Sequence, residues 1–470
     1  MKRILKFSLL IVLFVVVFVG YINYQKLVII SGLSSKWIAS GIFVGDRTQS
    51  SIEQSDSNFS PITWANNVVD FENKSVTTTV FGLKKRKAVY REGVGAVVIT
   101  EGFDENTPYL VPKRVIKPKK IPFPYGNLPQ KDTVFSTVDY ELLDAVVETY
   151  FDENTPGNTT RSLLVIYKNQ IIAEKYAEGF DKNSRLLGWS MGKSLMSAVC
   201  GVLNYQGKLN LETFAPIDEW KNDNRSKITI NNLLQMNSGL EWEEDYTKIS
   251  DVTKMLYLEN DMTKSQINKP LVGKPNETWN YSSGISNLLS GIIRGKFNTH
   301  QQYLDFWYSN LFDKIGMHSM VFETDLTGNY VASSYGWANT RDWAKFGLLY
   351  LNKGNWNGEQ IINEKWVKYS VTPTNGSEGI YGAQFWLNSG GHLPDVPKDM
   401  FFAGGYQGQS VFVIPSKDMV VVRLGVTYSK VEELLKQREI LPHENEDVVK
   451  FELKQMGFNN LLKNVLSAIE

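Results

Sequence analysis

The feature that most constrains this chain is an uninterrupted apolar segment near its N-terminus. Residues 7–24, FSLLIVLFVVVFVGYINY, carry no charged side chain. As a helix, this segment extends about 27 Å, close to the hydrocarbon thickness of a bilayer. Lys2, Arg3 and Lys6 precede it, so the positive-inside rule predicts a cytoplasmic N-terminus and an exported remainder. No polar stripe gives the segment a solvent face, which argues against a core helix.

A cleavable signal peptide is the alternative interpretation of residues 1–25. Signal peptides have a shorter apolar region that ends in small residues at a cleavage site. Here the apolar segment continues into residues 25–30, QKLVII, with no such pattern. A lipoprotein anchor is excluded because the only cysteine is Cys200. We therefore expect an uncleaved transmembrane anchor.

Composition excludes several classes of function. The chain has 50 Lys and Arg against 50 Asp and Glu, which argues against a nucleic-acid binder because those proteins normally carry a basic excess. One cysteine allows no intrachain disulfide and no Cys-based zinc site. The four histidines are scattered without metal-ligand spacing, so we expect neither a metal nor another cofactor.

Sequence patterns divide the rest of the chain in two. Residues 26–135 are mixed and contain a basic run at 84–87 and a basic, proline-rich stretch at 112–124. We interpret them as a membrane-proximal wrap or linker. Clear helix and strand signals begin near residue 136, and residues 136–470 are interpreted as one domain.

The strand signals of that domain lie at its two ends and helices lie between them. This order predicts an α+β fold, one antiparallel sheet flanked by helices. Apolar runs with turn residues between them predict strands at 162–167, 171–176, 381–387, 400–403, 409–414 and 419–424. Apolar spacing and capping residues predict helices at 139–150, 190–205, 229–236, 341–351 and 446–469.

The pair Ser190 and Lys193 carries the chemical hypothesis. On a helix, residues three apart share one face, so the lysine amine is expected beside the serine hydroxyl. A serine becomes a nucleophile when a base takes its proton, and a lysine can be that base where its surroundings favour the neutral amine. A helix N-terminus adds N–H groups that stabilise developing negative charge. A single Ser-x-x-Lys pattern is also compatible with an ordinary solvated helix face.

Two further segments could complete such a site. Tyr281 follows Trp279 in a small polar loop, and beside a protonated lysine it could relay a proton. The alternative is a half-buried tyrosine that makes one hydrogen bond. Residues 402–409, FAGGYQGQ, are rich in glycine. A strand edge at Gly405 could offer the Tyr406 N–H as an oxyanion donor opposite Ser190, or the segment could be a simple bend.

Together, the order Ser-x-x-Lys at 190–193, Tyr-x-Ser at 281–283 and the glycine-rich strand resembles the serine beta-lactamase and penicillin-binding-protein superfamily. Within it, the chain is most similar to the class C beta-lactamase-related serine hydrolases. These include D-alanyl-D-alanine carboxypeptidases, esterases and 6-aminohexanoate-dimer hydrolases. The resemblance covers about residues 136–430 and is supported by the stretches 228–240, 342–351 and 356–362. It implies Ser190 as the acylated nucleophile, Lys193 as its base and Tyr281 as the proton relay.

The chain departs from the family pattern at two positions. Many relatives have asparagine where this chain has Ser283, whose shorter hydroxyl can still hydrogen-bond to Lys193 or substrate. The third motif usually begins with lysine or histidine, and the matching residue here is Ala403. A cation there would help to hold a substrate carboxylate. Its absence favours ester or amide substrates of the 6-aminohexanoate-dimer type over β-lactams and D-Ala-D-Ala peptides.

The resulting hypothesis is a serine hydrolase that cleaves an ester or amide bond in a small-molecule or peptide-like substrate. The alternatives are a D-Ala-D-Ala carboxypeptidase or weak beta-lactamase with the same residues, and a catalytically silent binding protein of the same fold. The family implies a bacterial inner membrane with the catalytic domain on its periplasmic or external side. If the N-terminal segment is cleaved, the protein is secreted.

Overall fold

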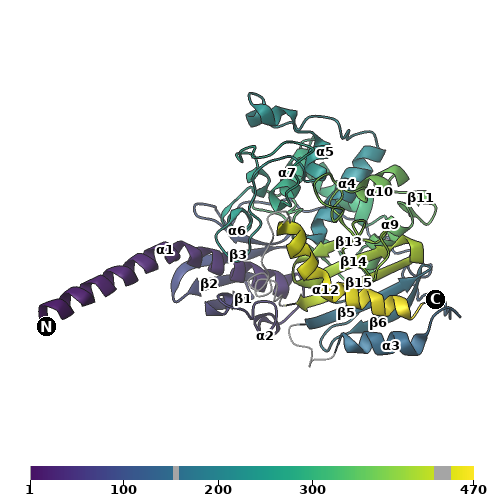
Figure 1. Ribbon diagram of the computed structural model, residues 1–470, viewed down its shortest axis with the longest axis horizontal. Coiled ribbons are helices and arrows are strands. Elements are labelled where there is room, and N and C mark those ends of the chain that lie inside the picture. Colours follow the sequence, from purple (N-terminus) through teal and green to yellow (C-terminus); the bar gives the residue numbers. More distant parts are fainter. Residues whose placement is uncertain (1, 152–157, 428–445, 470) are drawn as a thin grey trace. The chain divides into compact units, whose positions relative to one another are not determined.

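The computed structural model describes residues 2–151, 158–427 and 446–469 (Figure 1). The chain divides into two compact units. Unit 1 comprises residues 1–108 and 243–260, and unit 2 comprises residues 109–242 and 261–470. The region 26–135, expected as a wrap or linker, is thus shared between the units, with the change at residue 108. The segment 243–260 belongs to unit 1 although the chain of unit 2 surrounds it in sequence.

Helix α1 (Lys2–Phe43) runs without a break through the uncharged segment and beyond it. In the segment 7–24, Phe7, Phe14 and Phe18 are exposed. The second half of the helix is different, because two-thirds of the apolar window Lys26–Phe43 is buried within the protein (67%). By length and composition alone, α1 could cross a membrane.

Unit 1 is built on a four-stranded antiparallel sheet of order β1–β2–β3–β4. Ile38 and Ala39 of α1 pack on this sheet against Val76, Ala88 and Ala96. Alternate residues of β2 are buried, as expected of a strand with one covered face. The elements are β1 (Ala65–Asp70), β2 (Ser75–Val80), β3 (Leu83–Arg91), β4 (Gly95–Ile99), α2 (Gln49–Glu53), α6 (Asp251–Leu258) and the 3₁₀ turn Ile62–Trp64.

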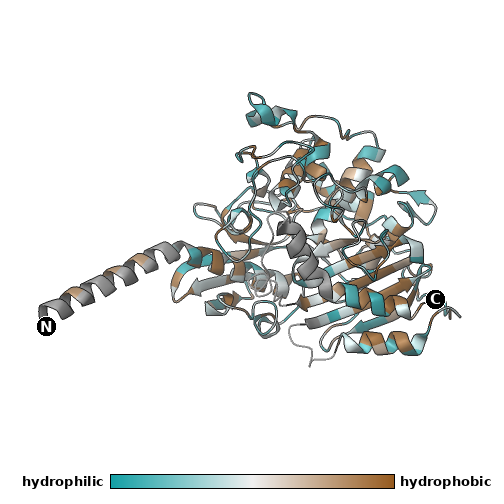
Figure 2. Cartoon of the chain, viewed as in Figure 1, coloured by the Kyte–Doolittle hydropathy of each residue, from teal (hydrophilic) through white to brown (hydrophobic). Residues whose placement is uncertain are grey.

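Unit 2 contains a six-stranded sheet of order β12–β13–β14–β15–β5–β6, antiparallel throughout. It places the last strand of the domain beside the first, because β15 pairs with β5. Figure 2 shows these strands as largely hydrophobic. The strands are β5 (Asn158–Tyr167), β6 (Gln170–Tyr176), β12 (Trp386–Leu387), β13 (Phe401–Gly405), β14 (Gln409–Ile414) and β15 (Met419–Thr427).

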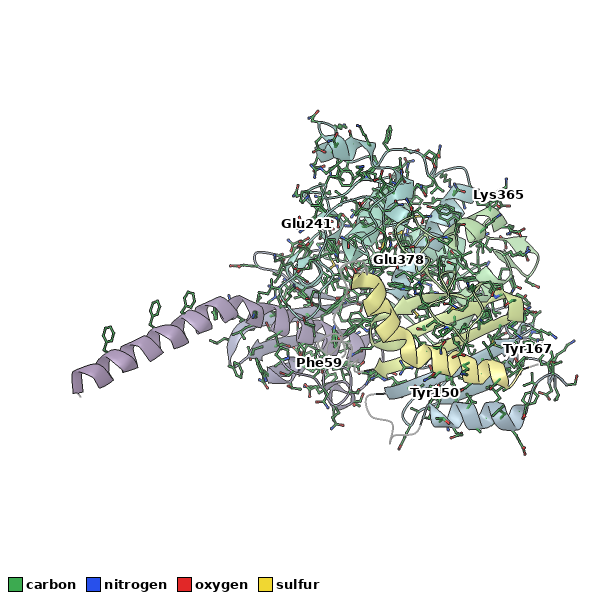
Figure 3. The ribbon with its side chains drawn as sticks, viewed as in Figure 1. Phe59, Tyr150, Tyr167, Glu241, Lys365 and Glu378 are labelled. Atoms are coloured by element: carbon green, nitrogen blue, oxygen red, sulfur yellow. The ribbon has the colours of Figure 1, made fainter. Side chains whose placement is uncertain are left out.

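The sheet of unit 2 is covered on both faces. Leu164, Val411 and Val422 point into a cluster with α4 and α9. Their strand neighbours enter a second cluster on the opposite face, which includes residues of α3 and α12. Tyr150 and Tyr167, labelled in Figure 3, belong to this second face. The predicted α+β fold with an antiparallel sheet between helices is therefore confirmed.

The other predicted elements of unit 2 recur with small shifts at their ends. The predicted strand 381–387 is wrong for its first five residues, because a turn in which the Gly382 N–H bonds to the Phe385 carbonyl (2.9 Å) replaces regular pairing there. The helices are α3 (Tyr140–Thr149), α4 (Met191–Tyr205), α5 (Ile230–Leu234), α7 (Ser283–Arg294), α8 (His300–Trp307), α9 (Thr340–Leu351), α10 (Glu364–Ser370) and α12 (Glu446–Ser467). Short strands are β7 (Leu186–Leu187), β8 (Val321–Phe322), β9 (Gly336–Ala338), β10 (Asn355–Trp356) and β11 (Glu359–Gln360).

Candidate active site

Ser190 stands at the start of α4, at the end of a sharp turn. Trp189 before it has a φ of +48°, in the left-handed region that bulky residues rarely adopt. Gly188 leads into this turn and donates its N–H to the Gly336 carbonyl of β9 (2.8 Å). A strained residue held by its surroundings is common at functional sites. The turn leaves the Ser190 side chain partly exposed at a helix N-terminus.

Lys193 lies against Ser190, as the spacing of three residues predicts. Its side chain is only 1% exposed. Its Nζ donates to the Ser190 Oγ (3.0 Å), the Ser283 Oγ (2.9 Å) and the Ser333 carbonyl oxygen (3.0 Å). All three acceptors are uncharged. The arrangement links the start of α4, the start of α7 and the loop before β9 through one amine.

Tyr281 is the third sequence candidate and lies beside the same amine. The Lys193 Nζ is 4.8 Å from the centroid of its ring. The ring stacks on Trp386 at 5.1 Å and meets Tyr381 edge-on at 5.7 Å. The preceding residue, Asn280, fixes the loop by donating its backbone N–H to the Met236 carbonyl (2.9 Å). Aromatic packing and the hydrogen bond of Asn280 therefore hold Tyr281 beside Lys193.

The glycine-rich end of β13 approaches the Ser190 turn closely. A Cβ on Gly405 would overlap the carbonyl oxygen of Gly188, so only glycine fits there. Tyr406 follows, with its ring edge-on to Trp189 at 5.7 Å. In the part of the chain that the structure describes, the Ser190 N–H has no hydrogen-bond partner. The two predicted oxyanion donors, the N–H groups of Ser190 and Tyr406, thus come from adjacent segments.

Two side chains that the sequence analysis did not single out hold the turn after Gly405 through hydrogen bonds to its backbone carbonyls. Gln409 donates its Nε2 to the Tyr406 carbonyl (3.1 Å). Arg423 donates its Nη1 to the carbonyls of Gln407 and Gly408 (3.1 Å each). Burial lowers the pKa of the Arg423 guanidinium to about 9, and the nearby Arg161 charge contributes. The signal in the sequence is a single charge inside the apolar strand 419–424.

Two other contributors carry no readable sequence signal. Ser333 acts through its backbone carbonyl, whose position depends on the fold and not on the side chain. Gln384, with a φ of +67°, joins two helices at the site. Its carbonyl accepts from Ser194 of α4 (2.7 Å) and its Oε1 accepts from Ser286 of α7 (2.8 Å).

Aromatic side chains lie on both sides of the pair, since Tyr281 is beside the Lys193 amine and Trp189 precedes Ser190. Ala403 occupies the place where the related motif carries a cation, and it is buried in the cluster around α4. Among the residues described, no three His, Cys, Asp or Glu side chains gather as metal ligands would. Trp189 and Trp386 contact Tyr406 and Tyr281, Trp242 packs near Gly284, Trp337 is buried in β9, and Tyr246 belongs to unit 1.

The fold and this geometry define a class of protein, the hydrolases with a beta-lactamase fold. An antiparallel sheet between helices is combined with a Ser-x-x-Lys pair at a helix start and a glycine-rich strand beside it. The family model described as Beta-lactamase matches residues 137–434, and the chain belongs to this family. The predicted resemblance is therefore confirmed, and the family includes relatives that act as hydrolases.

Individual relatives are distant. A 6-aminohexanoate-dimer hydrolase of Paenarthrobacter ureafaciens is 22% identical over 304 residues, which is 56% of this chain and 72% of that protein. A solved structure from Bacillus anthracis, a candidate 6-aminohexanoate-dimer hydrolase, has a TM-score of 0.52 at 22% identity and covers 62% of this chain and 79% of its own. EstCE1, a hydrolase with promiscuous acyltransferase activity, has a TM-score of 0.52 at 11% identity and covers 69% and 99%.

Proposed function

We propose that this protein is a membrane-anchored serine hydrolase that cleaves an ester or amide bond through a Ser190 acyl-enzyme. The observation that carries the proposal is the 3.0 Å separation of the Lys193 Nζ and the Ser190 Oγ at the start of α4. The serine is partly exposed while the lysine is buried. A substrate can therefore reach the alcohol while the amine is protected from water.

In the first step the neutral form of the Lys193 amine accepts a hydrogen bond from the Ser190 hydroxyl and takes its proton. Lys193 is 1% exposed, and burial disfavours the charged form of an amine. The Ser190 oxygen then bonds to the substrate carbonyl carbon. The oxyanion that forms accepts hydrogen bonds from the N–H groups of Ser190 and Tyr406.

Tyr281 relays the proton to the leaving group. Its place beside Lys193 supports this role, since the leaving alcohol or amine needs a proton when its bond to the carbonyl carbon breaks. Water then attacks the acyl-enzyme with the same residues acting in reverse, which releases the acid and restores the Ser190 hydroxyl. Ser283 holds the Lys193 amine in position through its hydroxyl.

The substrate class follows from the surroundings. Trp386 and Tyr406 offer flat apolar surfaces, and Ala403 supplies no cation for a carboxylate. We therefore favour small-molecule or short peptide-like esters and amides whose scissile carbonyl is flanked by uncharged groups. The names of the relatives, an amide-oligomer hydrolase and an acyl-transferring hydrolase, point in the same direction.

The anchor is part of the proposal. Helix α1 is continuous from Lys2 to Phe43, and its second half forms part of the core of unit 1. Cleavage after the apolar segment would leave that half with a free end, so an uncleaved anchor fits this architecture better than a signal peptide. The positive charges before the segment would keep its start in the cytoplasm of a bacterium and unit 2 outside the inner membrane.

Labelling with a fluorophosphonate or an activated ester tests the proposal directly. We expect one adduct per chain, on Ser190, and none on the Ser190→Ala variant. Ser197→Ala, seven residues further along the same helix, is the matched control and should still be labelled. A folded wild-type chain without an adduct at Ser190 would favour the catalytically silent alternative. Hydrolysis of nitrocefin or a D-Ala-D-Ala peptide in preference to esters and short amides would favour the beta-lactamase or carboxypeptidase alternative.

A further inference from the structure

The turn between β2 and β3 carries an aromatic residue in an unusual place. Val80 pairs with Leu83, so the turn consists of Phe81 and Gly82 alone, with φ angles of +53° and +73°. Two-residue turns of this kind prefer asparagine followed by glycine, because a bulky residue is strained at positive φ. Phe81 is also 69% exposed. Backbone preference does not account for a phenylalanine at this position, and most of its side chain is in contact with no other part of the protein.

Phe81 is one member of a small apolar surface, which we call the hairpin-tip patch and define as Trp64, Phe81 and Leu83. The ring of Trp64 is 5.8 Å from that of Phe81. Trp64 is 50% exposed and Leu83 is 47% exposed. Lys85 follows on the same strand and is exposed as well. The patch therefore combines exposed aromatic and aliphatic side chains with a neighbouring cation.

The patch lies next to the point where α1 leaves its apolar segment. The Nζ of Lys84 is 4.1 Å from the ring centroid of Tyr24, the last residue of that segment. The Lys84 carbonyl accepts a hydrogen bond from the Ser31 hydroxyl (2.6 Å). All of these residues belong to unit 1, so the hairpin tip and the end of the apolar segment are fixed together.

The opposite end of the same strands is far from this point. At that end, Phe43 of α1 meets Phe71 (6.2 Å between centroids) and Tyr90 (5.6 Å). Helix α1 thus runs along the strands, and the rise from Tyr24 to Phe43 is about 28 Å. Phe71 is 68% exposed, as Phe81 is, but it lies at the end of the sheet away from the apolar segment.

We propose that the hairpin-tip patch inserts into the interfacial layer of the bilayer that residues 7–24 cross. The inference rests on the proposed anchor. Tryptophan and other aromatic residues concentrate at the membrane–water interface, and lysine side chains there extend toward the headgroups. Tyr24 and the patch lie at the same position along α1, where the uncharged segment ends. Unit 1 then contacts the lipid through both the helix and the hairpin, so its orientation on the membrane is fixed.

A pair of single-site spin labels on the full chain tests this inference. The native Cys200 is buried, so it does not compete for the label. We compare Phe81→Cys with Phe71→Cys in nanodiscs of phosphatidylcholine and phosphatidylglycerol. We expect the label at 81 to collide more with oxygen, which dissolves in lipid, than with a water-soluble nickel chelate. The label at 71 should show the reverse.

The outcomes separate this inference from the anchor on which it depends. A chain that does not float with lipid vesicles contradicts the anchor itself. A chain that floats but shows mainly nickel collisions at both labels contradicts the patch alone. Shielding of label 81 from oxygen and nickel together means that protein covers the patch, which also overturns the proposal.

A variant that suits the turn provides a second test. Phe81→Asn places the preferred residue in the turn, so the fold should be retained. A label at Leu83→Cys should lie in the lipid when Phe81 is present and move toward water, with several-fold more nickel collisions, in the Phe81→Asn background. An unchanged label would overturn the role of Phe81 in seating the hairpin.

Discussion

The two units of this chain each bury a lysine, and they use it differently. In unit 1, Lys36 of α1 is 3% exposed and donates to the backbone carbonyl of Ala96 (2.6 Å). In unit 2, Lys193 is 1% exposed and donates to the hydroxyl of a serine that solvent can reach. A buried amine is therefore no sign of chemistry by itself. The proposed mechanism uses the contact of the second one with a side-chain hydroxyl.

The largest expected effect on activity comes from removing the Lys193 amine. Lys193→Met removes the base and should lower turnover of an ester substrate by about 10²- to 10⁴-fold. Lys36→Met is the matched control, since it also removes a buried amine but lies in unit 1. Turnover of that variant should stay within about twofold of the wild type. The measurement is kcat/KM on folded protein, and equal losses in the two variants would contradict a specific role of Lys193 as the base.

The next effect concerns the close approach of β13 to the Ser190 turn. Gly405→Ala adds a Cβ that overlaps the Gly188 carbonyl, so the strand must move and the Tyr406 N–H with it. A lost oxyanion donor lowers kcat by about 10²- to 10³-fold. We expect a loss at or below this range, with little change in KM. Gly457→Ala in α12, where a Cβ meets nothing within 4 Å, is the control and should leave kcat unchanged.

The smallest effect is on stability and compares two carboxyl groups. In unit 2, burial raises the pKa of Asp325 to about 6. The folded state then binds its proton more tightly than the unfolded state, so this group makes the protein less stable as pH rises from about 4 to 6. Asp325→Asn should remove up to about 3 kcal/mol of that pH-dependent loss. The measurement is the free energy of unfolding in urea at pH 4 and pH 7. An equal change between the two pH values in the wild type and in Asp325→Asn would contradict the expectation.

Asp70 of unit 1 contributes to stability with the opposite dependence on pH. Hydrogen bonds from the backbone and side chain of Asn73 lower the pKa of this exposed carboxyl. Its contribution is present above the unfolded pKa and is lost as pH falls through the lower folded pKa. Asp70→Asn should therefore matter slightly at pH 7 and not at low pH, whereas Asp325→Asn changes the stability of unit 2 in the other direction. The same unfolding curves, recorded with a probe in each unit, check this.

The sequence predicted those parts of the site that depend on local geometry. Ser190 and Lys193 meet because residues three apart on a helix share a face, whatever the rest of the chain does. Tyr281 and Gly405 were proposed as separate segments that could complete the site, and other interpretations of both stayed open because their approach to Ser190 is tertiary. The Ser333 carbonyl could not be proposed, because every residue has a carbonyl and only the fold directs this one at Lys193.

The fold was predictable to different degrees in the two units. Strands such as β14 and β15 are apolar runs between turns and were recognised with their ends nearly correct. Strands β1, β2 and β3 of unit 1 were missed because many of their residues are polar or basic, as in Leu83–Arg91 (LKKRKAVYR). The segment 381–387 failed for another reason. Its apolar residues lie in a turn and are buried in the core. Hydrophobicity alone does not distinguish such a turn from a strand.

The composition of unit 1 from two separate pieces of chain has a consequence for biosynthesis. Tyr257 of α6 is buried against Gly32 of α1, and its carbonyl accepts a hydrogen bond from Arg86 (2.8 Å). These contacts cannot form until residue 260 has been translated, long after α1 has emerged from the ribosome. The N-terminal helix and its sheet must therefore wait, incompletely covered, while more than half of the chain is made.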